Sequence, residues 1–66
     1  MLRIQVNGKV EQLTEAVSIA QFLEGKGVSP TALVERNAEI VKRDRYTEVR
    51  LQDGDELEVV QMMAGG

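Results

Sequence analysis

The sequence contains no cysteine, no histidine and no tryptophan among its 66 residues. Without cysteine or histidine, the chain has no thiolate nucleophile, no imidazole base and none of the usual side-chain ligands of transition metals. The disulfides and structural zinc sites that stabilise many small domains are therefore excluded. The fold must depend on one apolar core, which is thin in a domain of this size.

Positive charge and long apolar runs are also scarce. The formal net charge of -3 argues against nucleic acid as a partner, because phosphate binding needs concentrated positive charge. The most basic stretch, 42–50, is interrupted by acidic residues and contains a single aromatic residue, Tyr46. No apolar run approaches the roughly 20 residues that span a bilayer, and no signal-peptide pattern follows Met1. We therefore expect a cytoplasmic protein, monomeric when free, that binds neither nucleic acid nor membranes.

The first third of the sequence predicts a β-hairpin. Apolar and polar residues alternate over residues 2–6, as in a strand with one buried face. Asn7-Gly8 follows, and this pair favours the type I′ turn of a two-residue hairpin. A second strand is expected over residues 9–14, with Leu13 pointing towards the core.

A short helix is expected next, over residues 19–26. Ser18 can cap its first turn, and Gln21 completes the capping box. Gly25 and Gly27 indicate where it ends. Because so short a helix is unstable alone, it must pack across the hairpin.

The remainder predicts further strands and turns. Two short strands, 33–36 and 39–42, flank Asn37-Ala38, and Tyr46 is expected to pack inwards from a turn or single helical turn at 44–47. A turn at 53–55 precedes a final strand, 57–62. This order predicts an α+β fold, the ubiquitin-like β-grasp, with a mixed sheet and one main helix packed on one face. In that fold the first and last strands lie parallel at the centre of the sheet.

The final strand is expected to place unlike residues on its two faces. Leu57 and Val59 should point into the core, and the alternate positions should point outwards. This outer row changes from acidic to apolar at Val60 and Met62. With Met63, whose flexible thioether adapts to partner surfaces, they form a candidate docking patch. The alternative, equally compatible with the sequence, is that strand twist draws Val60 or Met62 into the thin core.

An acidic cluster surrounds the last turn. It consists of Asp53, Asp55, Glu56 and Glu58. These carboxylates could meet basic residues of a partner, but we interpret them as a solvated turn and strand edge.

The sequence ends in Ala64-Gly65-Gly66. We expect residues 1–62 to form the domain and residues 63–66 a flexible tail, which reaches at most about 14 Å when extended. Glycine has no Cβ, so such a tail can enter a narrow channel on another protein. Alone, however, a glycine pair is more typical of a loose chain end.

Together these features resemble the ThiS family of sulfur carrier proteins in thiamine biosynthesis. The resemblance spans essentially the whole chain. The matching segments are Val6-Asn7-Gly8, residues 34–37, Ile40-Val41 with Arg43, Asp53-Gly54-Asp55, Leu57 and Ala64-Gly65-Gly66. The related small subunits of molybdopterin synthase, and ubiquitin itself, share the glycine pair but are usually longer.

The resemblance implies that this chain is a stoichiometric carrier and not an enzyme. The carboxylate of Gly66 would be adenylated by an E1-like partner that uses ATP and magnesium, and a persulfide would convert it to a thiocarboxylate. Gly65 and Ala64 would thread the terminus into the partner. The other implied partners are a cysteine desulfurase or similar sulfur donor and thiazole synthase, which receives the sulfur. The chain itself would bind no cofactor and no metal.

Three alternatives remain open at this stage. The chain could serve molybdopterin or another sulfur-containing product. It could be a ubiquitin-like modifier that is joined to target lysines, or a β-grasp interaction module whose terminal glycines are idle.

Overall fold

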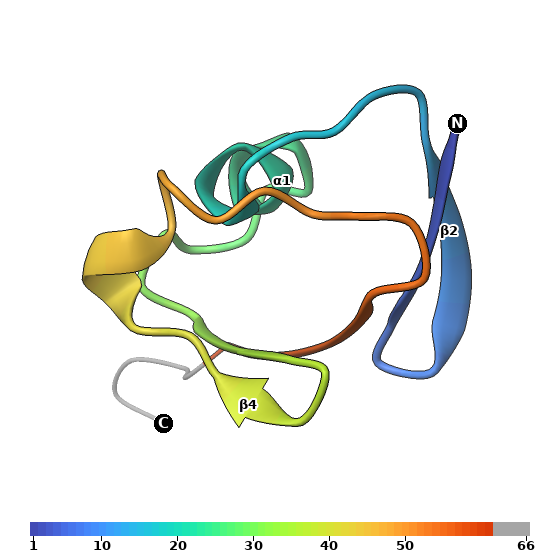
Figure 1. The fold of residues 1–66 in the computed structure, drawn as a ribbon. Coiled ribbons are helices and arrows are strands. Elements are labelled where there is room, and N and C mark those ends of the chain that lie inside the picture. Colours follow the sequence, from blue (N-terminus) through green and yellow to red (C-terminus); the bar gives the residue numbers. More distant parts are fainter. Residues whose placement is uncertain (62–66) are drawn as a thin grey trace.

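A computed structural model describes residues 1–61 of the chain. A sheet of five strands curves around a single α-helix, and no described element covers the other side of the sheet (Figure 1). The elements are β1 (Leu2–Val6), β2 (Lys9–Leu13), α1 (Ile19–Gly25), β3 (Leu33–Arg36), β4 (Glu39–Ile40), the 3₁₀ helix η1 (Arg43–Arg45) and β5 (Glu56–Val60). We call the uncovered side the outer face.

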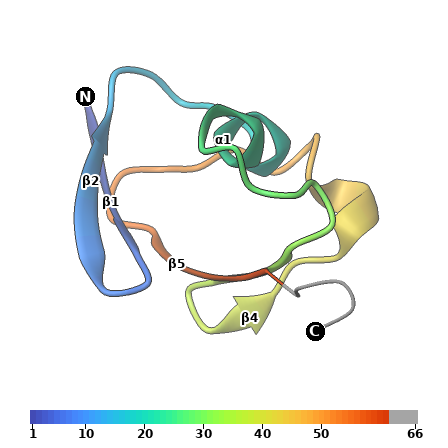
Figure 2. The same cartoon turned by 180° about the vertical axis from the view of Figure 1, so that it is seen from behind.

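The strand order across the sheet is β2-β1-β5-β3-β4. β1 and β2 form an antiparallel hairpin, β1 and β5 run parallel, and β3 is antiparallel to both β5 and β4. The last strand therefore occupies the centre, beside the first, and Figure 2 shows β5 lying between the β1–β2 hairpin and β4. The predicted β-grasp with one helix on one face is confirmed.

Local sequence explains both ends of α1. The Ser18 hydroxyl accepts a hydrogen bond from the Gln21 N–H, and the Gln21 side chain accepts one from the Ser18 N–H, so the predicted capping box is present. At the other end, Gly27 adopts a φ of 70°, and the Val28 N–H donates to the Leu23 carbonyl. This Schellman arrangement satisfies the last carbonyls and ends the helix at Gly25, one residue before the predicted limit.

The core lies between α1 and the inner face of the sheet. Its members are Ile4, Ile19, Phe22, Leu23, Val34, Tyr46, Leu51 and Leu57. The Tyr46 hydroxyl donates to the Ala32 carbonyl at 2.8 Å and accepts from the Val34 N–H at 3.1 Å. Tyr46 therefore packs inwards as predicted and ties η1 to the start of β3.

Four strand limits differ from the sequence prediction. β2 ends at Leu13, and β4 ends at Ile40, after which Val41 packs against the core and its N–H donates to the Val34 carbonyl. β5 starts one residue earlier than predicted and ends at Val60, so the predicted extension was wrong for Gln61, while Met62 lies outside the described residues. No helix in residues 1–61 is long and apolar enough to cross a membrane.

Candidate functional site

The predicted site lies where the chain leaves the centre of the sheet. β5 ends at Val60, which is the one predicted site residue that falls within residues 1–61. The other predicted site residues, Met62, Met63, Ala64, Gly65 and Gly66, lie outside the described residues, as does the predicted tail 63–66. The described site is therefore the surface beside the end of β5.

Val60 lies on the outer face and not in the core. It pairs across the strands with Leu33, and paired residues share one face of a sheet. Ile40 joins this face from β4, where it is paired with Glu35. The exposed fractions are 49% for Val60, 36% for Leu33 and 65% for Ile40. This apolar outer patch (Leu33, Ile40 and Val60) confirms the outward direction predicted for Val60.

Leu33 and Ile40 were not predicted as site residues, although the sequence carries a signal for them. Each stands next to another apolar residue, Val34 or Val41, and this breaks the strict alternation of a half-buried strand. Val34 is fully buried and Val41 packs against the core, so their neighbours must face the opposite side. The adjacent apolar pairs Leu33-Val34 and Ile40-Val41 therefore indicate that the sheet is apolar on both faces where β3 begins and β4 ends.

The outer face becomes acidic away from the apolar outer patch. Glu35 on β3 is directly opposite Glu58 on β5, and Glu56 lies two residues further along β5. Like charges directly opposite each other destabilise a sheet. The acidic row (Glu35, Glu56 and Glu58) is therefore a feature that the stability of the fold does not require.

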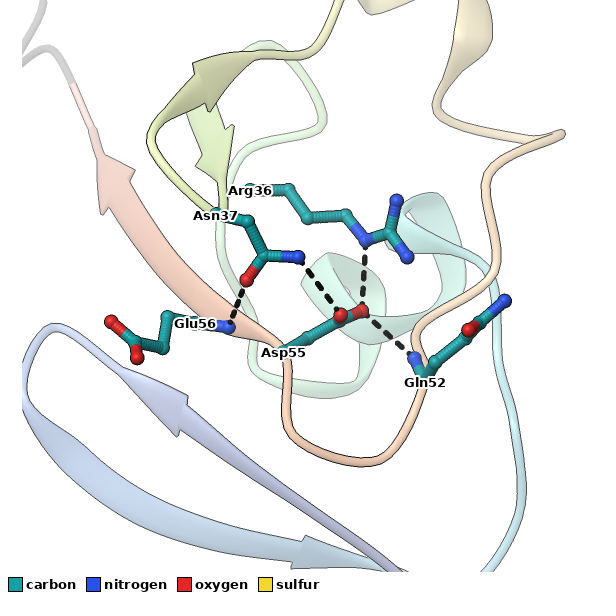
Figure 3. A network of polar contacts seen from close by, with 5 residues as sticks. All are labelled: Arg36, Asn37, Gln52, Asp55 and Glu56. Carbon is teal, nitrogen blue, oxygen red and sulfur yellow. Dashed lines mark hydrogen bonds and ion pairs between the residues drawn. The ribbon is translucent and has the colours of Figure 1, made fainter.

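Asp55 departs from the predicted solvated acidic cluster. Its side chain is buried, and it accepts hydrogen bonds from the Arg36 Nε–H at 2.8 Å, the Gln52 N–H at 2.8 Å and the Asn37 amide at 3.2 Å (Figure 3). Burial raises the pKa of Asp55, but the hydrogen bonds from Arg36, Gln52 and Asn37, together with the charge of Arg36, outweigh it and hold the pKa below its usual value. Asp55 is an internal structural carboxylate.

Asp53 is also engaged within the fold. Its Oδ1 accepts a hydrogen bond from the Arg3 N–H at 2.7 Å, which ties the turn to β1. The interpretation of a wholly solvated cluster was therefore wrong for Asp55, because the turn brings its carboxylate against the end of β3. Glu56 and Glu58 do remain exposed, as expected.

Two arginines of the basic stretch 42–50 have partners within the described part of the chain. Arg45 forms an ion pair with Glu48, and the Arg50 guanidinium donates to the Ala16 carbonyl. Residues 1–61 also contain no group of three or more acidic side chains placed to hold a metal ion.

Comparison with known proteins gives matches over nearly the whole chain. The model of the ThiS family matches residues 4–66. The sulfur carrier protein ThiS of Bacillus subtilis is 37% identical over 65 residues, which cover 96% of this chain and 98% of that protein. The crystal structure of a thiamine biosynthesis protein (ThiS) from Geobacter metallireducens superimposes with a TM-score of 0.82, at 28% identity, over 98% of this chain and 100% of that one.

Part of each of two longer proteins is similar to this chain. Thiazole synthases of Paramagnetospirillum magneticum and Magnetococcus marinus are each 35% identical over 66 residues. These matches cover 98% of this chain but 20% of each synthase, so the chain spans about a fifth of their length. The family match, the full-length similarity to a ThiS protein and the shared fold agree, and the chain belongs to the ThiS family.

Proposed function

We propose that this chain is a sulfur carrier of thiamine biosynthesis that carries sulfur as a thiocarboxylate on Gly66. The observation that supports this most strongly is the match of the family model to residues 4–66, which includes Ala64-Gly65-Gly66. Beyond this C-terminal segment, a sulfur carrier needs no catalytic residues of its own. The domain presents the terminus and a docking surface, and partner enzymes supply the catalysis.

The chemistry begins with a carboxylate, which is a poor electrophile because its charge repels nucleophiles. Attack of a Gly66 carboxylate oxygen on the α-phosphorus of ATP, with magnesium held by the activating enzyme, gives an acyl-adenylate and pyrophosphate. A persulfide sulfur then attacks the carbonyl carbon and expels AMP. Cleavage of the S–S bond by a thiol leaves the thiocarboxylate. The absence of cysteine is compatible with this scheme, since the sulfur travels on the backbone terminus.

Thiazole synthase is the proposed acceptor of the sulfur. In the synthases of P. magneticum and M. marinus, a domain similar to this chain belongs to the same polypeptide. Covalent linkage raises the effective concentration of one partner at the other, which favours a productive encounter between them. The source of the persulfide would be a cysteine desulfurase or a similar enzyme.

Intact-mass measurement tests the carrier function. The purified chain is incubated with the adenylating enzyme of the same organism, ATP, magnesium and a persulfide donor. We expect a mass increase equal to the exchange of one oxygen for one sulfur. Deletion of Gly66 should abolish this increase without loss of folding, because the core lies within residues 4–57.

The same incubation separates the alternatives. An unchanged mass with an enzyme that is active on another carrier would contradict the proposal and favour an idle interaction module. High-mass adducts with other proteins would favour a ubiquitin-like modifier. Delivery of the sulfur to molybdopterin synthase, and not to thiazole synthase, would indicate the other carrier class.

The apolar outer patch is proposed to dock on the partner enzymes, together with Met62 and Met63. Its three described side chains lie beside the last residues of β5, so a partner that receives the terminus would meet them first. Exposed apolar side chains that gather on one face of a small domain are typical of interaction surfaces.

A pair of matched variants tests the docking surface. Val60 and Val10 are both 49% exposed on the outer face, but Val10 lies on β2, at the far edge of the sheet. We expect Val60→Glu to weaken binding to the adenylating enzyme by about tenfold or more, because a charge would be buried in an apolar contact. Val10→Glu should bind as the wild type does. Equal losses for both variants, or unfolding of Val60→Glu in near-UV circular dichroism, would contradict the assignment.

A further inference from the structure

The two parallel central strands differ in how far they extend. Main-chain pairing of β1 with β5 ends at Val6 and Leu57, because the chain turns at Asn7. β5 continues to Val60, where β3 is still its neighbour on the other side. The last part of β5 has therefore lost its main-chain partner in β1.

The side chain of Asn7 replaces that partner. Its Oδ1 accepts a hydrogen bond from the Val59 N–H at 2.8 Å, and its Nδ2 donates to the Val59 carbonyl at 3.2 Å. The Asn7 main-chain N–H donates to the Leu57 carbonyl at 2.9 Å. The amide group thus acts as one more peptide unit of β1 and extends the ladder to Val59. Asn7 has a φ of 50°, a conformation that asparagine tolerates well.

A second contact holds the next part of the chain. The Gln61 side chain accepts a hydrogen bond from the Ser29 N–H at 3.0 Å, in the loop that follows α1. The end of β5 is therefore tied to the β1–β2 turn through Val59 and to this loop through Gln61.

The other hairpin provides an internal counterpart. Asn37 occupies the same position of a two-residue turn, with a φ of 53°. Its Oδ1 accepts from the Glu56 N–H at 2.9 Å, and its main-chain N–H donates to the Glu56 carbonyl at 2.8 Å. Each hairpin turn thus presents an asparagine to β5. Asn37 holds the beginning of the strand, and Asn7 holds the end from which the chain leaves.

We propose that Asn7 is a positioning residue for the reaction at the terminus, and this inference depends on the proposed carrier function. By fixing Val59, it restricts the directions in which the following residues leave the docked domain. Placement of a reacting group in one geometry removes an entropic part of the barrier. Loss of the hydrogen bonds between the Asn7 side chain and Val59 should therefore slow adenylation within the docked complex and leave docking itself intact.

Asn7→Gly and Asn37→Gly form the matched test. Glycine keeps the positive φ that both turns require, so each variant removes only the side-chain contacts. Two measurements are made: amide hydrogen exchange in the free chain, and steady-state release of pyrophosphate with the adenylating enzyme.

For Asn7→Gly we expect the Val59 amide to exchange about fivefold faster, as loss of one net hydrogen bond predicts. We also expect kcat to fall severalfold at unchanged KM. For Asn37→Gly the Glu56 amide should exchange faster, while kcat stays at the wild-type value. Asn7→Asp retains the acceptor for the Val59 N–H but sets its second oxygen against the Val59 carbonyl, so it should restore amide protection and kcat only in part.

The outcomes separate this inference from the proposed function. A wild-type chain that is not adenylated refutes the carrier function and with it any role of Asn7 in loading. A wild-type chain that is adenylated, with equal kcat for Asn7→Gly and Asn37→Gly, refutes the positioning role alone. Unchanged exchange of the Val59 amide in Asn7→Gly, or a KM that rises while kcat stays unchanged, also overturns the proposal.

Discussion

Replacement of Asp55 by alanine should destabilise this domain more than any substitution of an exposed carboxylate. Asp55 is 5% exposed and accepts three hydrogen bonds, which join the end of β3 to the turn before β5. Alanine would leave the Gln52 N–H without its acceptor and the Arg36 guanidinium without its counter-ion. Both groups would then be only partly hydrated.

The size of the effect follows from these contacts. Hydrogen bonds to a charged group contribute about 1.5–3 kcal/mol each, and loss of one partner of a buried ion pair costs about 3–5 kcal/mol. The Arg36 side chain is 27% exposed and can turn towards water, which reduces the cost. We expect Asp55→Ala to lower the free energy of unfolding by about 2–4 kcal/mol. That is a large share of the roughly 3–10 kcal/mol available to a chain of this length.

Asp55→Asn provides a milder variant. Its one oxygen can still accept from Arg36 and Gln52, but its NH₂ group would then face the Asn37 NH₂ group. Asn37 cannot simply rotate its amide, because its own oxygen accepts from the Glu56 N–H. We expect a loss of about 1–2 kcal/mol.

Urea denaturation monitored by far-UV circular dichroism measures both variants. With a slope near 1 kcal/mol/M for a small domain, Asp55→Ala should lower the midpoint by about 2 M or more. Asp44→Ala, at an exposed position in η1, is the control and should change the free energy of unfolding by no more than about 0.5 kcal/mol.

The pH dependence gives an independent check. The pKa of Asp55 is lower in the folded chain than its usual value, so the unfolded chain takes up a proton first as the pH falls. The stability from the Asp55 carboxylate is fully present above the unfolded pKa of about 3.9 and is lost as the pH falls towards the folded pKa. The difference between wild type and Asp55→Asn should therefore shrink below about pH 4. A difference that stays constant from pH 7 to pH 3, or an Asp55→Ala variant as stable as Asp44→Ala, would refute this reasoning.

Two further predictions concern turns and core. Ala38 has a φ of 70°, and the equivalent residue of the other hairpin is Gly8. Because glycine adopts a positive φ more easily than alanine, Ala38→Gly should raise the free energy of unfolding by about 0.5–1 kcal/mol. Gly8→Ala should lower it by the same amount, and urea denaturation measures both. Outside Gly8 and its two chain neighbours, no atom lies within 4 Å of a Cβ added at Gly8, so a larger loss there would contradict a purely backbone origin. Tyr46→Phe should cost about 1–3 kcal/mol in thermal unfolding, because the Ala32 carbonyl and the Val34 N–H lose their shared hydroxyl partner. A cost near zero would show that water replaces the hydroxyl.

The sequence predicted most of the fold because its signals are local. Asn7-Gly8, the Ser18 capping box and the alternation over residues 2–6 each act within a few residues, and the structure contains all three elements. The strand limits were less predictable. β4 ends at Ile40, two residues before the predicted limit, and the chain then enters η1, next to which Tyr46 makes tertiary contacts that no local pattern reveals.

The site was predictable only in part. The outward direction of Val60 follows from strand periodicity, but the contributions of Leu33 and Ile40 depend on strand order and register. The role of Asn7 was not accessible from sequence either. Its residue type is explained fully by the turn, and only the structure reveals that the same side chain also binds Val59.

β5 is held unequally along its length. At its beginning, Asn37 binds Glu56, and the buried Asp55 network fixes the preceding turn. At its end, β5 is still paired with β3 through Leu33 and Val60, but its other contacts are the exposed hydrogen bonds of Asn7 and Gln61, which compete with water. Local stability should therefore decrease from Glu56 towards Gln61, because solvent-exposed hydrogen bonds open at lower free energy. In the proposed carrier function, the contacts at the start of β5 would anchor the strand in the domain, while those of Asn7 and Gln61 would set the direction of its end.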